Sequence, residues 1–450
     1  MSLKKKLFAR RLLIIAFILL SISAPVVVGA VEFEDTSPLR DYLDYAEEHN
    51  PGLQSARLKW KSALQKIPQA TSLPEPKLSY AHFIEEVETR VGPQEQKIGL
   101  RQKFPFPGKL DLRGRLADAN AEALFYSYQS RKQDLYYRVK SSYSEYYNLG
   151  RSIAITRDNM EILKNLEEVL RSRYATNQSR YSDLIKAQVE LGKLDDRLKS
   201  FLRMRPALRA RLNAALNRAP EAEIPFPRQL EENEIKFSRR QLQTMAREVN
   251  PELVEIKSRI EQEKIRGDLA RKNRYPDFSL GVDYIRTGEA RMGGVSDSGK
   301  DPLVAMITVE LPLWRGKYKA EEREASEMEK SFQRRSAQKE NRIISELQYA
   351  YYRYQDAVRK TSLFQDALIP KAEQSFRAAR TAFEAGQVDF MNLLDAQRQL
   401  LEFSLALEGA RRDRSVALAT LEQIVSREIV INEKNKSIQK FDKTRKGDEQ

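Results

Sequence analysis

The stretch Pro76-Lys77-Leu78-Ser79-Tyr80 returns as Pro276-Asp277-Phe278-Ser279-Leu280, at an offset of 200 residues. At the same offset, Asn50-Pro51-Gly52-Leu53 returns as Asn250-Pro251-Glu252-Leu253. Self-similarity at a fixed spacing is the sequence signature of a duplicated structural unit. The chain is therefore predicted to contain two copies of one repeat.

The offset grows to 207 further along, where Phe104-Pro105-Phe106 corresponds to Leu311-Pro312-Leu313. We place the extra residues in the Gly- and Ser-rich stretch from Thr287 to Asp301, opposite the shorter stretch from Val87 to Gln94. Insertions are tolerated best in exposed loops. The sequence therefore predicts a surface loop between two elements of nearly constant length.

Two segments of each repeat alternate apolar and polar residues, which is the period of a β-strand. The apolar positions are Leu78, Tyr80, His82 and Ile84; Ile98, Leu100 and Phe104; Phe278, Leu280, Val282 and Tyr284; and Leu303, Ala305, Ile307, Val309 and Leu311. Each run is about nine or ten residues long, which is enough for a tilted strand to cross a bilayer core. Soluble hairpins contain similar runs.

Very long helices are predicted after each strand pair. No Pro and almost no Gly occurs from Lys109 to about Asn177, and from Lys317 to about Ala385 the only breaker is Pro370, which should kink or split the second rod. At 1.5 Å per residue each rod is about 100 Å long. Apolar residues in the first rod step by threes, fours and sevens, which predicts lateral packing as in a coiled coil. They are Leu135, Val139, Tyr146, Leu149, Ile153, Met160, Leu163, Leu166, Leu170 and Tyr174.

Composition excludes several classes of function. The chain has 450 residues, of which 41% are hydrophobic and 32% charged, too polar for several large globular cores. It contains no Cys, which excludes disulfides, thiolate metal sites and Cys nucleophiles, and only His49 and His82 could supply imidazole. Pairs of carboxylates such as Glu85 and Glu86 have no evident partners, so we expect no enzyme activity, no cofactor and no metal centre.

The first thirty residues are predicted to be a secretory signal peptide, cut after Ala30. A basic start precedes an apolar run from Leu12 to Leu20, and small residues follow. A retained membrane anchor is the alternative, because the run could be extended to near spanning length. Removal of five basic residues with this segment lowers the formal charge from +14 to +9. The remaining basic residues alternate with acidic ones, which disfavours nucleic acid as a partner.

Four strands cannot close a barrel in a membrane. Strands in lipid must pair every backbone donor and acceptor, and closed membrane barrels begin at about eight strands. If the four segments span the membrane, several copies must each contribute a sheet, and a cyclic homo-oligomer is the simplest arrangement.

Several motifs together resemble the TolC family of outer-membrane efflux proteins. They are the repeat, the strands ending in Phe104-Pro105-Phe106-Pro107-Gly108-Lys109, the Pro-rich centre from Arg218 to Pro227, and the turn from Gly386 to Gln397. The resemblance covers residues 38 to 430, and the sequence from Gln102 to Leu110 is similar to that of the heavy-metal-resistance branch of the family.

The resemblance implies a mainly α fold with a small membrane β-barrel. Four strands per chain would join a shared twelve-stranded barrel in a homotrimer, and long antiparallel helical hairpins would form a periplasmic tunnel. It implies a passive exit duct in the outer membrane of a Gram-negative envelope, with a large periplasmic part. The partners would be outer-membrane lipid, a periplasmic adaptor (membrane fusion) protein and an inner-membrane transporter of the RND type. The cargo would be heavy-metal cations or drugs.

The turns between the long helices are the expected periplasmic tips. Gly386 permits a sharp reversal, and its counterpart Asn177 can adopt the same left-handed conformation. By resemblance these turns dock the adaptor, through Asn177, Gln178, Ser179, Gly386, Gln387 and Val388. Their alternative role is that of ordinary helix caps.

An acidic ring that narrows the tunnel is also implied by the resemblance, with Asp395 as its main residue. The family pattern has two acids three residues apart, but the first is Asn392 here, and Asp389 one turn earlier could replace it. Asp183 and Lys186 are the equivalents of Asn392 and Asp395 in the first repeat, where the Lys suggests an ion pair that closes the mouth. The alternative is that Asp395 is an exposed helix residue paired with Arg398 or Lys186.

The predicted organisation is a signal peptide (1–30), a first repeat (31–218), a Pro-rich linker (219–234), a second repeat (235–430) and a disordered charged tail (431–450). A competing hypothesis is a secreted coiled-coil scaffold or adhesin whose strands form a soluble sheet. A basic nucleic-acid-binding filament is disfavoured by the signal peptide.

Overall fold

Each repeat folds in the predicted order of short helices, two strands, a very long helix, a turn and a second long helix. The computed structural model describes residues 33–232 and 234–430, so the predicted signal peptide and charged tail lie outside the described residues. The first repeat contains α2 (Leu39–His49), α3 (Pro51–Leu64), α4 (Lys66–Thr71), β1 (Lys77–Thr89), β2 (Gly92–Phe104), α5 (Lys109–Ala175) and α6 (Tyr181–Leu216). The second contains α7 (Arg239–Val249), α8 (Pro251–Lys272), β3 (Asp277–Thr287), β4 (Leu303–Glu310), α9 (Arg315–Ser362), the π-helix η1 (Leu363–Leu368), α10 (Ile369–Glu384) and α11 (Phe390–Val425).

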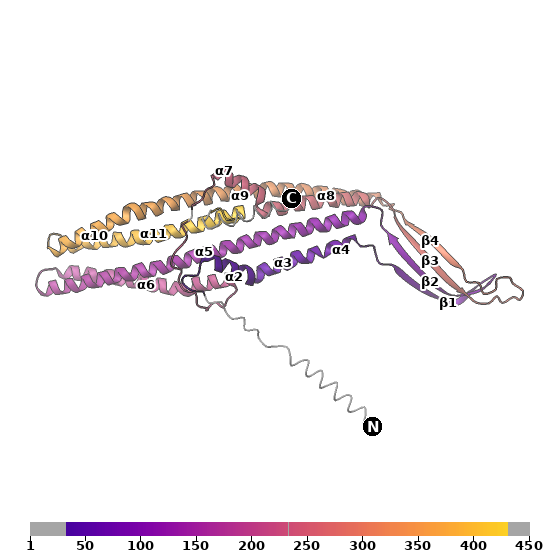
Figure 1. Cartoon of the computed structure of the whole chain (residues 1–450), viewed down its shortest axis with the longest axis horizontal. Helices are drawn as coiled ribbons and strands as arrows, with labels where there is room; N and C mark the ends of the chain where they lie inside the picture. Colours follow the sequence, from indigo (N-terminus) through magenta and orange to yellow (C-terminus); the bar gives the residue numbers. More distant parts are fainter. Residues whose placement is uncertain (1–32, 233, 431–450) are drawn as a thin grey trace, which may run out of the picture.

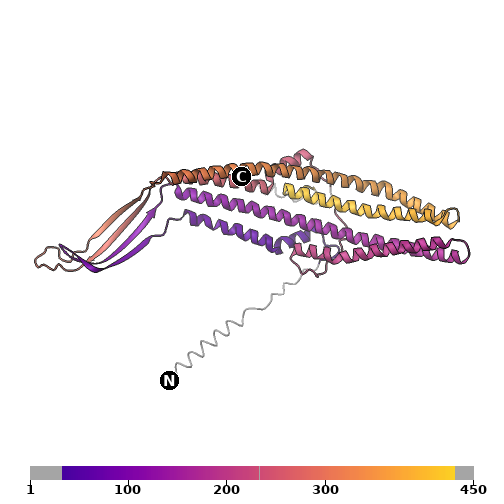
Figure 2. The ribbon, with the colours of Figure 1, turned by 180° about the vertical axis from the view of Figure 1, so that it is seen from behind.

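The molecule is elongated, with the four strands at one end and the turns of the long helices at the other (Figure 1). One antiparallel hairpin consists of α5 and α6, and the other of α9, α10 and α11; the view from behind shows them running along each other (Figure 2). Within residues 33–232 and 234–430, no helix is both long and apolar enough to span a membrane. The predicted mainly helical fold with long hairpins is confirmed.

The four strands form one antiparallel sheet in the order β1-β2-β3-β4. Their register brings the predicted apolar positions of neighbouring strands opposite each other. The rows are Tyr80, Ile98, Tyr284 and Leu303; Leu78, Leu100, Val282 and Ala305; and Phe104, Phe278 and Val309. These side chains are largely exposed, as Leu78 is at 75% and Leu303 at 72%. The sheet therefore presents an uncovered apolar face.

The opposite face of the sheet carries charges that pair across strands. The Lys97 ammonium lies 2.7 Å from the Asp283 carboxylate, and the Lys103 ammonium lies 3.3 Å from that of Asp277. Because successive side chains of a strand point to opposite faces, the alternation predicted from the sequence separates an apolar face from a polar one. Among the described residues, no strand pairs with the outer edge of β1 or of β4.

The predicted long surface loop joins β3 to β4, over residues 288–302. It folds onto the short turn of the first hairpin, where the Gly288 amide donates to the Pro93 carbonyl (2.7 Å) and the Gly299 amide to the Val91 carbonyl (2.7 Å). The extra residues of the second repeat therefore lie at the far end of the sheet.

The repeated Asn-Pro pair has the same structural role in both repeats. The Asn50 side chain accepts the Leu53 amide proton at the start of α3, and its own amide donates to the Ala215 carbonyl in α6 (3.2 Å). Asn250 caps α8 in the same way and donates to the Ile424 carbonyl in α11 (2.8 Å). An Asn at the N-cap followed by Pro is a strong helix-start signal. Each pair also ties a short helix to the end of the returning long helix.

The predicted apolar stripe of the first rod is buried, with two exceptions. Met160 is half-buried, and Tyr174 is 45% exposed, so its assignment to the buried stripe was wrong. Tyr174 lies beside the tip, where its ring contacts that of Tyr181 at a centroid distance of 5.5 Å. The helical seam therefore ends one turn before the helix does.

The second rod is divided where Pro370 predicted a kink or split. The π-helix η1 directly precedes α10, and Pro370 lies in the first turn of α10. Equivalent buried positions of the two rods show that the second rod gains one residue at the π-helix. Before it, Val139 and Tyr146 correspond to buried Leu347 and Tyr354, an offset of 208, whereas beyond it Leu163 corresponds to Ala372, an offset of 209. A π-turn accommodates one extra residue within a helix, so η1 absorbs the inserted residue.

The Pro-rich linker packs against the first rod at Gly150. Residues 219–232 contain no helix or strand, and the Phe226 ring lies 4.5 Å from that of Tyr146. A Cβ atom on Gly150 would lie 2.7 Å from the Phe226 ring. Gly150 therefore allows the linker to approach the helix.

We expect Gly150→Ala to destabilise the protein by about 1–3 kcal/mol, because the new methyl group displaces Phe226. Thermal unfolding in detergent, followed by circular dichroism, should show a lower midpoint. Gly192→Ala is the matched control in a helix, since a Cβ atom on Gly192 would have no neighbouring atom within 4 Å and Ala is the better helix former. Equal midpoints for the two variants would contradict the packing role of Gly150.

Candidate functional site

Both tips end their first helix with the same backbone motif. Asn177 and Gly386 adopt left-handed conformations, with φ of 57° and 73°. The Gln178 amide donates to the Arg173 carbonyl (2.7 Å), and the Gln387 amide donates to the Ala382 carbonyl (2.8 Å). These bonds are those of a Schellman motif, which satisfies carbonyls that a helix end leaves free. The predicted left-handed residues are confirmed in both turns.

The side chains of the two turns differ in exposure. Gln178 and Gln387 are exposed, whereas Val388 is half-buried against the apolar core below the tips. The Ser179 hydroxyl donates to the Leu170 carbonyl (3.2 Å), which closes the first turn onto α5. The turns are therefore compact, and they offer mainly amide side chains to a partner.

Arg173 links the two tips, and the sequence reasoning did not identify it. Its guanidinium donates to the Phe383 carbonyl (2.9 Å) and to the Glu384 carbonyl (2.7 Å), at the end of α10. It also lies 4.8 Å from the centroid of the Phe383 ring. A cation is favoured at a helix C-terminus, where carbonyl groups give a partial negative charge. The end of the first rod therefore caps the end of the second.

The acidic residues named in the sequence analysis lie at the starts of α6 and α11. Asp389 is the N-cap of α11, and its carboxylate accepts the Asn392 amide proton (3.1 Å). Asp183 lies in the first turn of α6, 3.4 Å from the Lys186 ammonium on the same helix. Asn392 is exposed. In the single chain, Asp389 thus has a local capping role, and Lys186 pairs along its own helix.

Asp395 is exposed on α11 and lies beside a cation. Its side chain is 64% exposed, and its carboxylate is 3.4 Å from the Arg398 guanidinium. Arg398 reaches across to α6, where it forms an ion pair with the buried Glu190. Burial opposes the ionisation of Glu190, but the hydrogen bond and charge of Arg398 outweigh it and hold the pKa of Glu190 below its ordinary value. Arg398 thus connects the exposed acid to the neighbouring helix.

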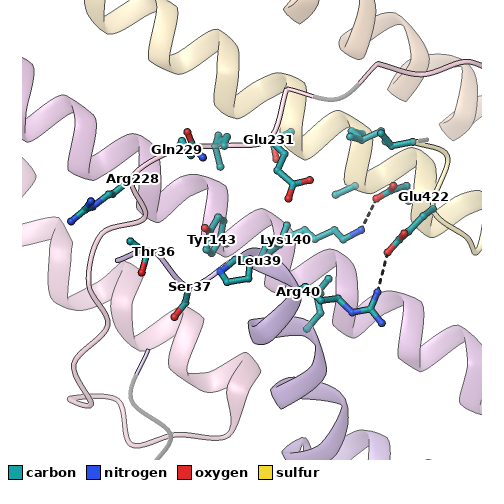
Figure 3. Close-up of a pocket in the computed structure, with 18 of the residues that line it drawn as sticks. Thr36, Ser37, Leu39, Arg40, Lys140, Tyr143, Arg228, Gln229, Glu231 and Glu422 are labelled. Carbon is teal, nitrogen blue, oxygen red and sulfur yellow. Dashed lines mark hydrogen bonds and ion pairs between the residues drawn. The ribbon is translucent and has the colours of Figure 1, made fainter. Parts of the chain in front are cut away.

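A cavity of about 610 Å³ lies at the waist of the molecule, away from the tips. It is bordered by the start of α2, the linker residues 228–231, α5 and α11, and Figure 3 shows Lys140 pointing toward Glu422 across it. Their charged groups lie 2.6 Å apart. Burial raises the pKa of Glu422, and Lys140 opposes this. Within the described residues, no cluster of three or more His, Asp or Glu side chains could hold a metal ion.

The Arg173 contact yields a prediction for the tips. Arg173→Met removes two charge-assisted hydrogen bonds, each worth about 1.5–3 kcal/mol. Amide hydrogen exchange in residues 383–388 should accelerate about tenfold or more. Arg171→Met is the control, because Arg171 is an exposed residue of α5 that pairs with Glu167 on its own helix. Unchanged exchange in Arg173→Met would show that the tips are held together by other contacts.

Comparison with known proteins agrees with this architecture. The sequence model of the family "Outer membrane efflux protein" matches residues 242–427. The chain is 24% identical over 161 residues to the cobalt-zinc-cadmium resistance protein CzcC of Cupriavidus metallidurans, a match that spans 35% of either protein. The matched part is thus about a third of that relative.

Solved structures show the fold over nearly the whole chain. The structure of CusC superposes with a TM-score of 0.73 and 16% identity, and covers 88% of this chain and 93% of the other. The open state of the Neisseria gonorrhoeae outer membrane channel MtrE superposes with a TM-score of 0.71 and 16% identity, and covers 90% and 94%. The matched family and these structures are channel proteins, not enzymes.

The recognition made from the sequence motifs is confirmed. The motifs, the family match and the shared fold give the protein the family's localisation, the outer membrane with a large periplasmic part. The second repeat thus matches the outer membrane efflux protein family, and over nearly the whole chain the fold is that of the TolC-like channel structures.

Proposed function

We propose that the protein is the exit duct of a tripartite efflux pump. The proposal rests on the elongated arrangement of the described residues. At one end lies a sheet with an apolar face whose outer edges have no strand partner among these residues, and at the opposite end lie two adjoining helical turns. A sheet with an apolar and a polar face suits a wall between lipid and water. Helices of 67 and 36 residues then extend the duct away from the membrane.

Three copies of the chain would complete this duct. Each copy supplies four strands, so a homotrimer forms a twelve-stranded barrel in contact with outer-membrane lipid. The helical hairpins of the same copies surround the axis as a periplasmic tunnel. The duct has no proposed energy source for transport, so it is passive. Its opening depends on its partners.

The tips are the proposed docking site for the partners. A periplasmic adaptor would contact the two turns, at Asn177, Gln178, Ser179, Gly386, Gln387 and Val388, and connect them to an inner-membrane transporter of the RND type. Exposed amide side chains and turn backbone at this end supply polar contacts for such an adaptor. The resemblance to CzcC, named for cobalt-zinc-cadmium resistance, favours heavy-metal cations over drugs as the cargo.

Purification and conductance measurements test the duct directly. We expect the protein to be extracted only with detergent, as a heat-sensitive trimer, and to give cation-selective conductance in planar bilayers. A monomer or dimer that is released without detergent and has no conductance would overturn the proposal. That result would favour a secreted coiled-coil scaffold or adhesin.

Asp395 is the proposed main residue of the pore constriction. Three Asp395 carboxylates around one axis would concentrate cations, with Asn392 and Asp389 one and two turns away. Arg398 lies close enough to limit this charge, and the Asp183 and Lys186 pair occupies the equivalent place on α6.

Asp395→Ala should raise the single-channel conductance and weaken block by divalent or trivalent cations, because it removes the carboxylates that bind the blocking ion. Bilayer recordings with increasing concentrations of the blocking cation measure both effects. Asp41→Ala is the control, since Asp41 is an exposed acid on α2, far from the tips. An unchanged block in Asp395→Ala would remove Asp395 from the constriction.

A further inference from the structure

The polar face of the sheet carries cations of two kinds, those with an acidic partner and those without one. Lys97 and Lys103 each lie within 3.3 Å of a carboxylate on β3. Arg101 and Lys77 form no ion pair with any side chain of residues 33–232 and 234–430. The sheet thus neutralises the charges of Lys97 and Lys103 but not those of Arg101 and Lys77.

Arg101 and Lys77 lie directly opposite each other on β2 and β1. Their sequence neighbours Leu100 and Leu78 are on the apolar face, so both cations are on the polar face. Both side chains are exposed. Like charges directly opposite each other on neighbouring strands are destabilising. This pair therefore lowers the stability of the sheet unless an anion offsets its charge.

A glycine on β3 lets the Arg101 side chain lie across the sheet. Gly281 is the residue opposite Arg101, and a Cβ atom on it would lie 3.5 Å from the Arg101 Nε atom and 3.6 Å from its Cγ atom. Beyond Gly281, the Arg101 Nη2 group donates to the Met306 sulfur on β4 (3.3 Å). The guanidinium is therefore held over β3 and β4, on the side away from Lys77.

The sulfur contact fixes the position of Arg101 but leaves its charge in place. A thioether is a weak, neutral acceptor, and a guanidinium has five N–H donors. The Met306 contact engages a donor of one nitrogen, and the Arg101 side chain is exposed. A carboxylate at position 306 would have neutralised the guanidinium, as carboxylates do for Lys97 and Lys103. Arg101 is thus a positioned cation with donors to spare.

We propose that Arg101, with Lys77 beside it, binds a divalent oxyanion such as sulfate or hydrogen phosphate. The forked guanidinium matches two oxygens of an oxyanion, and a charge-assisted pair of this kind is stronger than a neutral one. Lys77 adds a second positive charge in the same row and attracts the anion further. The site itself rests on contacts within the sheet, whereas its place inside a pore rests on the proposed function.

In the proposed duct the site lies on the lumen side, near the end of the barrel that joins the helices. Arg101 is three residues before the end of β2, and α5 begins soon after it. Rings of Arg and Lys side chains favour anions in a pore. Three empty sites would repel exported cations, and bound oxyanions would remove this repulsion. The site would therefore let cations pass the barrel together with their counter-ions.

Equilibrium dialysis with radiolabelled sulfate tests the site in the full chain, purified in an uncharged detergent at low ionic strength. We expect saturable binding that unlabelled phosphate displaces. Met306→Glu places a carboxylate beside the guanidinium and should weaken sulfate binding about tenfold or more, because it competes for the same charge-assisted hydrogen bonds. Met306→Gln keeps a neutral acceptor there and should retain binding.

Two further variants separate the site from general effects of charge. Arg101→Met should lose sulfate binding. Met292→Glu is the control, because it adds the same charge as Met306→Glu in the loop between β3 and β4, where Met292 is 79% exposed, and it should bind sulfate normally. Thermal unfolding of each variant, followed by circular dichroism, identifies any loss of binding that comes from loss of fold.

Equal sulfate binding by Arg101→Met and the unaltered protein, or no saturable binding by the unaltered protein, would overturn the site. Either result would leave the duct intact, because conductance of the unaltered protein in planar bilayers decides the duct separately. Sulfate binding by a protein without conductance would overturn the duct and leave the site.

Discussion

A strand in lipid must find a hydrogen-bond partner for every backbone amide and carbonyl, and the rest of this structure depends on that requirement. Residues 33–232 and 234–430 contain four paired strands, with an apolar face and with no strand beyond the outer edges of β1 and β4. One sheet of this size cannot close upon itself in a bilayer. In the proposed homotrimer, identical copies supply the missing strand partners and the helical hairpins surround one axis.

The duplication explains how one chain can encode contacts between its own repeats and contacts between copies in the proposed homotrimer. The internal junction of β2 with β3, and of α5 with α11, shows which residues meet when one repeat follows another. Differences between the repeats mark the places where the two junctions are not identical. Arg173 caps the neighbouring tip within the chain, but its equivalent in the second repeat is Ala382, which cannot do so. In the proposed homotrimer, the tips of adjacent copies would therefore lack the contact that joins the two tips of one chain.

The sequence predicted the elements well because their signals are local and repeated. The alternation in the strands, the absence of Pro and Gly from the rods, and Pro370 each act within a few residues of where they appear. Sequence reasoning missed features that depend on distant contacts. The π-helix differs from the first rod by only one inserted residue, which the sequence pattern did not reveal. Nothing in the sequence around Gly150 predicted that the linker packs against it. Tyr174 continues the helical spacing of the apolar stripe of α5, but it lies beyond the last buried residue of that stripe.

The candidate site was less accessible from sequence than the fold. Gly386 and Asn177 were identifiable because left-handed turns favour these residue types. Arg173 was not, because a guanidinium that bonds backbone carbonyls leaves no complementary charge in the sequence to reveal it. Glu190 and Arg398 are 208 residues apart in the sequence, and only folding brings their two helices together.

Amide hydrogen exchange of β1 and β4, measured in the protein reconstituted into lipid, reports whether the edge amides have hydrogen-bond partners. If identical copies close the sheet, the outward-facing amides of both edge strands should exchange as slowly as those of β2 and β3. Fast exchange along both edges, with β2 and β3 protected, would show that the sheet remains open and that copies do not close it.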